Sequence, residues 1–160
     1  MMADTSVPGS VQRLVADSNN IFQLDSGSIP VFFMSATRGN SDQIVTITNN
    51  QVENARGEFG TVLDVRQSSA TDPAVTVNQN VTVSKNTFLS GKANSIGGVI
   101  SVRKENLAAE VNQVIEFLEN ECTLNAAVVG GVLSLYAADA VTGYQMVTLK
   151  QNTFTSNEAD

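Results

Sequence analysis

The sequence predicts an α+β fold: a mainly β-sheet domain with one long amphipathic helix at 105–121 and a short helix at about 49–59. Three observations lead to this prediction. Short runs rich in β-branched residues recur between Gly, Asn and Asp clusters, which is typical of strands. Apolar and polar residues alternate strictly over 75–83, which indicates a half-exposed sheet. A single apolar stripe with helical spacing occupies 105–121.

Strands are expected in the first half of the chain at 11–15, 21–24, 29–35, 43–48 and 62–66. The run 43–48 is rich in β-branched residues, which favour strands. Thr48 or Asn49 can cap a short helix, because a side-chain oxygen there accepts a bond from a free N–H of the first turn. Val52, Ala55 and Phe59 share one face of that helix.

The clearest helical pattern in the second half is an apolar stripe made by Leu107, Val111, Val114, Ile115 and Leu118. These positions recur at the spacing of a single helix face. Before it, 99–102 is a strand candidate. After it, 132–137 and 144–150 flank a turn at 139–143 and predict a β-hairpin.

One compact domain is expected over residues 11–151, because 160 residues are about one domain and can bury a core without metals or disulfides. Residues 1–10 are predicted to be a polar N-terminal arm, and 152–160 a polar C-terminal tail. Residues 81–88 resemble 147–154 at five of eight positions. A true repeat would favour sheet symmetry, but a single pair fits chance equally well.

Charge and composition exclude several classes of partner. Charged residues make up only 16% of the chain, and its net charge is −7. A nucleic-acid groove would carry a basic stripe, so no direct nucleic-acid partner is expected, and the same charge argues against an anionic membrane surface. The polar surface must consist largely of amides and hydroxyls, which cost less to bury against neighbours than charges do.

Catalytic chemistry has few residues to use. The chain has no His and one Cys, so Ser-His and Cys-His pairs cannot form within it. Cys122 follows two glutamates and is expected to be a small buried hydrophobe. The glycine doublets lack phosphate-binding spacing. We therefore expect no enzyme activity, no cofactor, and no catalytic, cofactor-binding or metal-ligating residue.

The order of elements between residues 7 and 61 resembles the N-terminal region of contractile-tail sheath proteins of bacteriophages. The pieces that carry the resemblance are Pro8-Gly9-Ser10-Val11, the apolar run 29–37, Gly39-Asn40, the strand 43–47, Thr48 and Phe59-Gly60. The resemblance implies a non-enzymatic subunit that polymerises through extended termini adding strands to neighbours. Full sheath proteins are much longer, and residues 62–160 match nothing in them.

The expected function is therefore a structural virion protein of a bacteriophage: a sheath-like tail subunit that assembles with copies of itself and other virion proteins. Capsid decoration is the first alternative, and a small soluble binding or adhesion module the second. Its expected location is the virion, after synthesis in the host cytoplasm, because the N-terminus lacks the features of a signal peptide. The predicted assembly contacts lie in the two terminal segments: Val7, Pro8, Gly9, Val11, Asn152, Thr153 and Phe154.

Overall fold

The protein is a parallel β-solenoid, which a computed structural model describes for residues 2–5, 10–22, 31–36, 41–67, 76–104, 110–137 and 142–160. The regular structure in these ranges is β-strand, and the strands pair in parallel. The described part of the chain contains no helix. The α+β prediction is therefore wrong.

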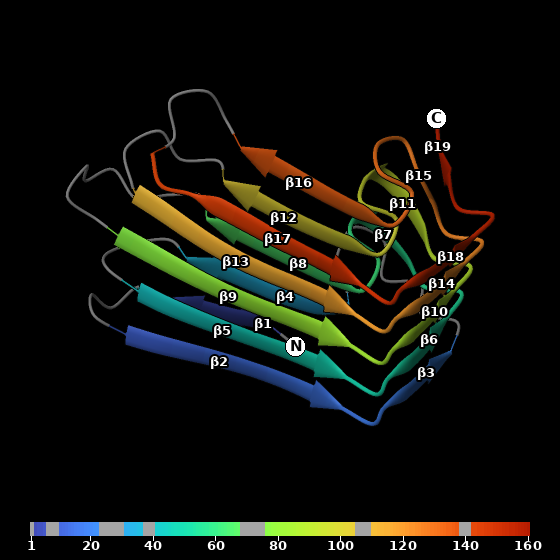
Figure 1. Cartoon of the computed structure of the whole chain (residues 1–160), viewed down its shortest axis with the longest axis horizontal. Helices are drawn as coiled ribbons and strands as arrows, with labels where there is room; N and C mark the ends of the chain where they lie inside the picture. Colours follow the sequence, from blue (N-terminus) through green and yellow to red (C-terminus); the bar gives the residue numbers. More distant parts are fainter. Residues whose placement is uncertain are drawn as a thin grey trace.

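Two sheets form the broad faces of the solenoid, and their strands run in opposite directions (Figure 1). The long-strand sheet consists of β2 (Ser10–Asp17), β5 (Ser41–Thr48), β9 (Thr76–Ser84), β13 (Glu110–Leu118) and β17 (Gln145–Lys150). The return sheet consists of β1 (Met2–Thr5), β4 (Phe32–Ala36), β8 (Leu63–Gln67), β12 (Ile100–Lys104) and β16 (Leu133–Ala137).

Two further sheets of short strands connect these faces at one side of the molecule (Figure 1). The corner sheet consists of β3 (Asn20–Phe22), β6 (Gln51–Glu53), β10 (Thr87–Leu89), β14 (Glu121–Thr123) and β18 (Thr153–Thr155). The third sheet consists of β7 (Arg56–Phe59), β11 (Lys92–Ile96), β15 (Ala126–Ala127) and β19 (Glu158–Ala159). A complete turn visits the long-strand, corner, third and return sheets in that order.

Left-handed residues make the sharp corners of the turns in the part of the chain that the structure describes. The first corner follows the long strand and has positive φ at Ser18, Asn49, Lys85, Glu119 and Gln151. The second corner has positive φ at Asn54, Ser90, Leu124 and Ser156. All nine of these residues have Cβ atoms, and the left-handed conformation is uncommon for such residues. The hydrogen bonds of the neighbouring turns must therefore hold these corners in place.

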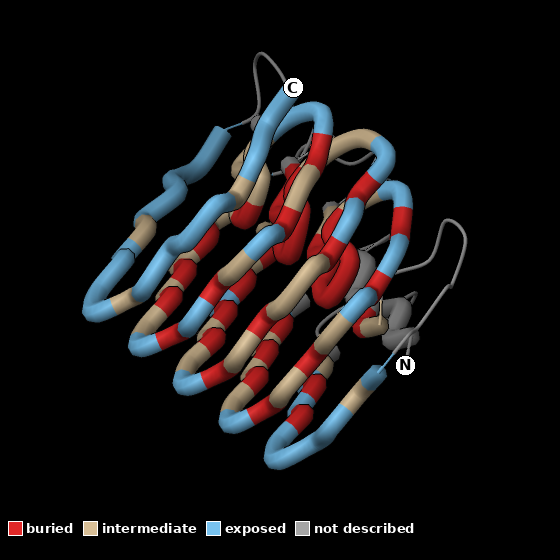
Figure 2. Tube along the Cα trace, turned by 90° about the vertical axis from the view of Figure 1, so that its right-hand side faces the viewer, coloured by how far each residue is buried: buried red, intermediate tan, exposed pale blue. Residues whose placement is uncertain are grey.

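The core lies between the long-strand and return sheets. The alternation at 76–83 is confirmed: Val77, Gln79, Val81 and Val83 are buried, and the residues between them are more exposed. Val75 lies outside the described residues. Figure 2 shows the same alternation of buried and exposed positions in turn after turn. Inward-facing aliphatic side chains of both sheets form one apolar cluster that includes Leu14, Val45, Ile115, Leu63 and Val102.

The predicted long helix at 105–121 is wrong, because its described part is the nine-residue strand β13 followed by a corner and β14. Residues 105–109 lie outside the described residues. Val111, Gln113, Ile115 and Phe117 are fully buried, which is a period of two. The sequence hid this period because a polar Gln113 faces inward while apolar Val114 faces outward.

The predicted short helix at 49–59 is also wrong. This segment holds β6 and β7, separated by a corner at Asn54 whose φ is +54°. Val52 and Ala55 are buried by neighbouring turns rather than by a shared helix face. The predicted hairpin at 132–150 is wrong too, because β16 and β17 belong to different sheets.

The two terminal segments take part in the solenoid. Strand β1 within 1–10 pairs with β4, while β18 and β19 within 152–160 pair with β14 and β15. The similar stretches 81–88 and 147–154 occupy equivalent positions two turns apart, since both align with the same residues of β13 and β14. The pair therefore belongs to a structural repeat.

Candidate assembly surface

An asparagine ladder runs along the first corner of all five turns, through Asn19, Asn50, Asn86, Asn120 and Asn152. Each Asn donates its backbone N–H and its side-chain Nδ2–H to the Oδ1 atom of the next Asn, at 2.8–3.1 Å. The side-chain amide also donates to strand carbonyls, as from Asn86 to Ile47. The ladder therefore stabilises the corner and sets the register of neighbouring turns.

A shorter ladder lies at the second corner of the last turns. Asn125 donates its backbone N–H and Nδ2–H to Oδ1 of Asn157, at 3.0 and 2.9 Å. The backbone N–H of Gly91 donates to Oδ1 of Asn125 at 2.9 Å. The polarity is the same as in the first ladder, from earlier turn to later turn.

A glutamine ladder of the opposite polarity crosses the interior. The side-chain amide of each Gln donates to Oε1 of the Gln one turn earlier, at 2.6–2.9 Å, through Gln12, Gln43, Gln79, Gln113 and Gln145. The three central members are fully buried. Burying an amide is costly unless it is hydrogen-bonded, so each rung depends on the turns on either side.

Aromatic side chains stack along the corner in the last three turns. The rings of Phe88 and Phe117 have centroids 6.4 Å apart, and those of Phe117 and Phe154 are 6.1 Å apart. In the fourth turn the corner-sheet position holds the small, buried Cys122, and Phe117 of the long strand extends the stack instead. Burial and the nearby Glu121 raise the pKa of the Cys122 thiol to about 12, so it remains protonated at neutral pH.

A buried ion pair joins β8 and β12 on the other face of the return sheet. The Arg103 guanidinium donates to both carboxylate oxygens of Asp64, through Nε at 3.1 Å and Nη2 at 2.6 Å. It also lies 4.1 Å from the centroid of the Phe59 ring. Two hydrogen bonds and an aromatic face offset part of the cost of removing these charges from water.

The last turn is the open end of the solenoid. Its strands β17, β18 and β19 each pair on one side only, and the return sheet ends at β16. Leu149 is 56% exposed, whereas its neighbour in register, Phe117, is fully buried. Phe154 is 50% exposed, whereas Cys122 in the same row is fully buried. Figure 2 shows this turn as largely exposed along its length.

The first turn has a closed interior. Leu14 and Ala16 face inward from β2 and are 1% and 5% exposed. Strand β1 extends the return sheet past β4 and contacts β2. The exposed apolar side chains of this turn lie elsewhere: Val11 and Val15 face outward from β2, and Phe22 lies at the end of β3.

The predicted assembly residues that the structure describes fall on the two ends of the solenoid. Val11 lies on β2 and is 64% exposed. Asn152 ends the long asparagine ladder, and Thr153 and Phe154 are exposed on β18. Val7, Pro8 and Gly9 lie outside the described residues. The sequence did not predict Leu149 as a contact residue. The signal that could have found it is the similarity of 81–88 and 147–154, in which Leu149 aligns with the buried Val83.

The described residues contain no cluster of three or more His, Cys, Asp or Glu side chains arranged to hold a metal ion. Within the same ranges, no helix is long and apolar enough to cross a membrane.

Comparisons with protein-family models, curated proteins and solved structures found no match. The strand–turn–strand–helix order behind the resemblance to tail sheath proteins differs from the observed order. Strands β4 and β5 lie in different sheets, and two corners and two strands replace the helix.

Proposed function

We propose that the protein is a non-enzymatic structural module that assembles through the open end of its solenoid. The observation that carries this proposal is the exposure of Leu149 and Phe154, at 56% and 50%, in rows whose members in the three middle turns are buried. Both lie on edge strands, β17 and β18, each of which pairs with one strand among the described residues. Exposed parallel edges of this kind are used for strand addition.

A charge placed on the inward row of β17 tests this proposal. Leu149→Lys should weaken assembly at least tenfold, because the contact would bury an ammonium group without a partner. Thr82→Lys is the matched control, since it adds the same charge in the same outward row, on a strand that is paired on both sides. Sedimentation velocity over a concentration series measures the effect. Equal assembly of both variants would contradict a contact at the inward row.

The setting we propose is a bacteriophage particle, with a tail role ahead of capsid decoration. Its support is the small share of charged residues and the many amides and hydroxyls, which suit contacts with neighbouring subunits. Its partners there are copies of itself and other virion proteins. Mass spectrometry of purified particles tests this setting, and absence of the protein from them would refute it.

A binding or adhesion module is the second candidate, and a different surface favours it. The outward face of the long-strand sheet carries hydrogen-bonded polar rows, in which Asn112 donates to Asn78 and Asn78 to Asp42. Held side chains on a flat sheet lose little entropy when they bind a ligand. Substitutions on this face that abolish binding without changing assembly would support this candidate.

A further inference from the structure

We propose that the occupant of the open end is the first turn of a second copy of this chain, stacked head to tail. This inference rests on the proposed structural function and names its partner and geometry. Three independent features of the two ends support it: the order of the strands, the polarity of the ladders and the residues that would meet across the junction.

The strand order makes the two ends complementary. The last described strand, β19, belongs to the third sheet, and the next position in a turn is a return-sheet strand. The first described strand, β1, is a return-sheet strand that comes before the long strand β2. In a head-to-tail stack, β1 of the second copy therefore lies beside β16, in the return-sheet position across from β17, just as β1 contacts β2 within its own chain.

The ladders continue across the junction with the correct polarity. Each Gln donates to the Gln of the preceding turn, so Gln12 of the second copy donates to Oε1 of Gln145. Each Asn donates to the Asn of the following turn, so Asn152 donates to Oδ1 of Asn19 in the second copy. Both ladders thus gain a rung of the same kind that they have within the chain.

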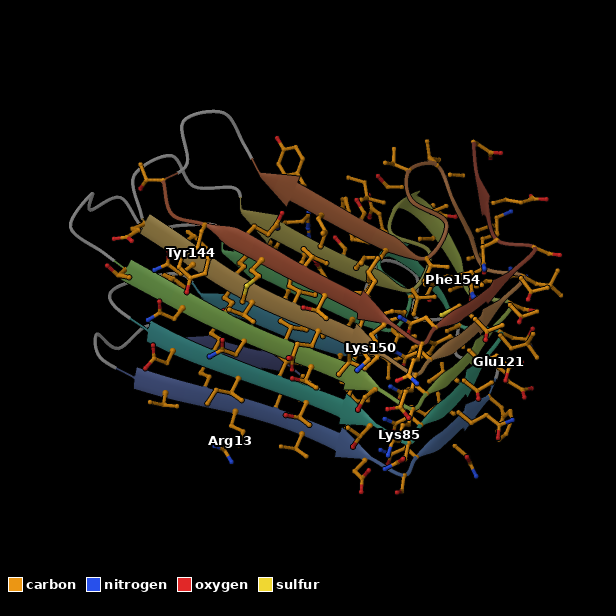
Figure 3. The ribbon with its side chains drawn as sticks, in the orientation of Figure 1. Arg13, Lys85, Glu121, Tyr144, Lys150 and Phe154 are labelled. Atoms are coloured by element: carbon orange, nitrogen blue, oxygen red, sulfur yellow. The ribbon has the colours of Figure 1, made fainter. Side chains whose placement is uncertain are left out.

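The rows of the long-strand sheet also match at the junction. Strand register places Lys150 next to Asp17 of the second copy, Met146 next to Arg13 and Thr148 next to Val15. The first pair has opposite charges, and none of the three brings like charges together. Inward, Leu149 meets the small side chain of Ala16. Figure 3 shows Lys150 on β17 and Arg13 on β2 at opposite edges of the sheet.

Such a contact joins two different surfaces and does not close on itself, so it produces an open rod. Neighbouring strands are about 4.8 Å apart, and each copy adds five long strands. The rod should therefore have an axial repeat of about 24 Å per copy.

Disulfide trapping between two single-cysteine variants of the full 160-residue chain tests this geometry. Val15→Cys and Thr148→Cys place the new thiols on adjacent strands of different copies, within the reach of a disulfide. An oxidised mixture of the two should form mostly mixed dimers, and each variant alone should stay largely unlinked. Thr82→Cys mixed with Thr148→Cys is the control, since residue 82 lies two strands inside the chain. The native Cys122 is buried and should not take part.

The outcomes separate this inference from the proposed function. Thr148→Cys dimers formed without the Val15→Cys partner would indicate a symmetric tail-to-tail contact, which overturns head-to-tail stacking but keeps assembly at the open end. Concentration-dependent assembly with no mixed disulfide, including from the second pair Asp17→Cys and Lys150→Cys, overturns stacking alone. A chain that stays monomeric at every concentration and is absent from particles overturns both.

Discussion

Buried side-chain amides set the register of the solenoid residue by residue. A parallel ladder that slips by one residue moves its inward side chains to the outer face. Here a slip would also separate Gln79 from Gln43 and Gln113, and Asn86 from Asn50. A misaligned ladder would therefore lose these hydrogen bonds, in addition to the packing that aliphatic side chains lose.

Replacing the central glutamine with an apolar residue of similar size should destabilise the fold. Gln79→Leu leaves the Gln113 amide without its acceptor in an apolar interior, which costs about 1–3 kcal/mol in the free energy of unfolding. Asn80→Ala, one residue along on the exposed face, should change this free energy by less than about 0.5 kcal/mol. Urea denaturation measures both variants. Equal losses would mean that the rung contributes no specific stability.

Asp17 offers a test of corner geometry by titration. Hydrogen bonds from Asn49 and Thr48 lower the pKa of its carboxyl group below 3.8. The folded pKa lies below the unfolded one, so the stabilisation is present above the unfolded pKa and is lost as pH falls through the folded pKa. Asn49→Gly removes the bond that lowers this pKa most and accepts the positive φ of this corner, so the pKa should rise towards 3.8. Carboxyl-carbon NMR measures it; an unchanged pKa would contradict this account.

At the scale of strands, the sequence revealed one element clearly and concealed another. In β9 the outward positions are Asn and Thr, so the period of two was visible. In β13 the outward Val114 and Leu118 joined inward Val111 and Ile115 in an accidental helical stripe. Period alone cannot distinguish these cases when apolar residues occupy both faces.

The repeat was hidden for a related reason. Successive rungs of the long asparagine ladder are separated by 31, 36, 34 and 32 residues. Most of the change in spacing arises in the connections between strands, so a search for one fixed period finds only isolated pairs. For the candidate site, the sequence predicted contacts in the polar terminal segments. It could not predict the open last turn, because that turn is defined by the order of the strands in the sheets.

The ion pair between β8 and β12 should contribute little net stability, whereas removing only one of its two charges should be strongly destabilising. Asp64→Leu removes the carboxylate beside a buried guanidinium, and the loss should be about 3–5 kcal/mol in the free energy of unfolding. The double variant Asp64→Leu with Arg103→Met removes both charges and should recover most of that loss. Chemical denaturation of the single and double variants measures the coupling. A double variant as unstable as Asp64→Leu would show that the charges themselves are needed.

For the molecule as a whole, the solenoid is close to one-dimensional: each turn mainly contacts the turns before and after it. The ladder residues of the central turns hydrogen-bond to the turns on both sides, while those of the first and last turns hydrogen-bond on one side. Any gain from assembly should therefore concentrate at the first and last turns. The junction pair Lys150 and Asp17 gives a direct measure of this.

Reversing one charge of this pair should weaken assembly, and reversing both should restore it. Lys150→Asp places two carboxylates on adjacent strands and should raise the dissociation constant about fivefold, because cross-strand charge pairs contribute about 0.2–1 kcal/mol. Adding Asp17→Lys to Lys150→Asp should bring the dissociation constant most of the way back to that of the unmodified protein. Lys150→Gln should have a dissociation constant between those of the unmodified protein and Lys150→Asp. Salt at 1 M should shrink the differences, since the Debye length is then about 3 Å. Because both charges lie far apart within one chain, rescue by the double variant requires contact between copies, and its failure would remove the charge argument for head-to-tail stacking.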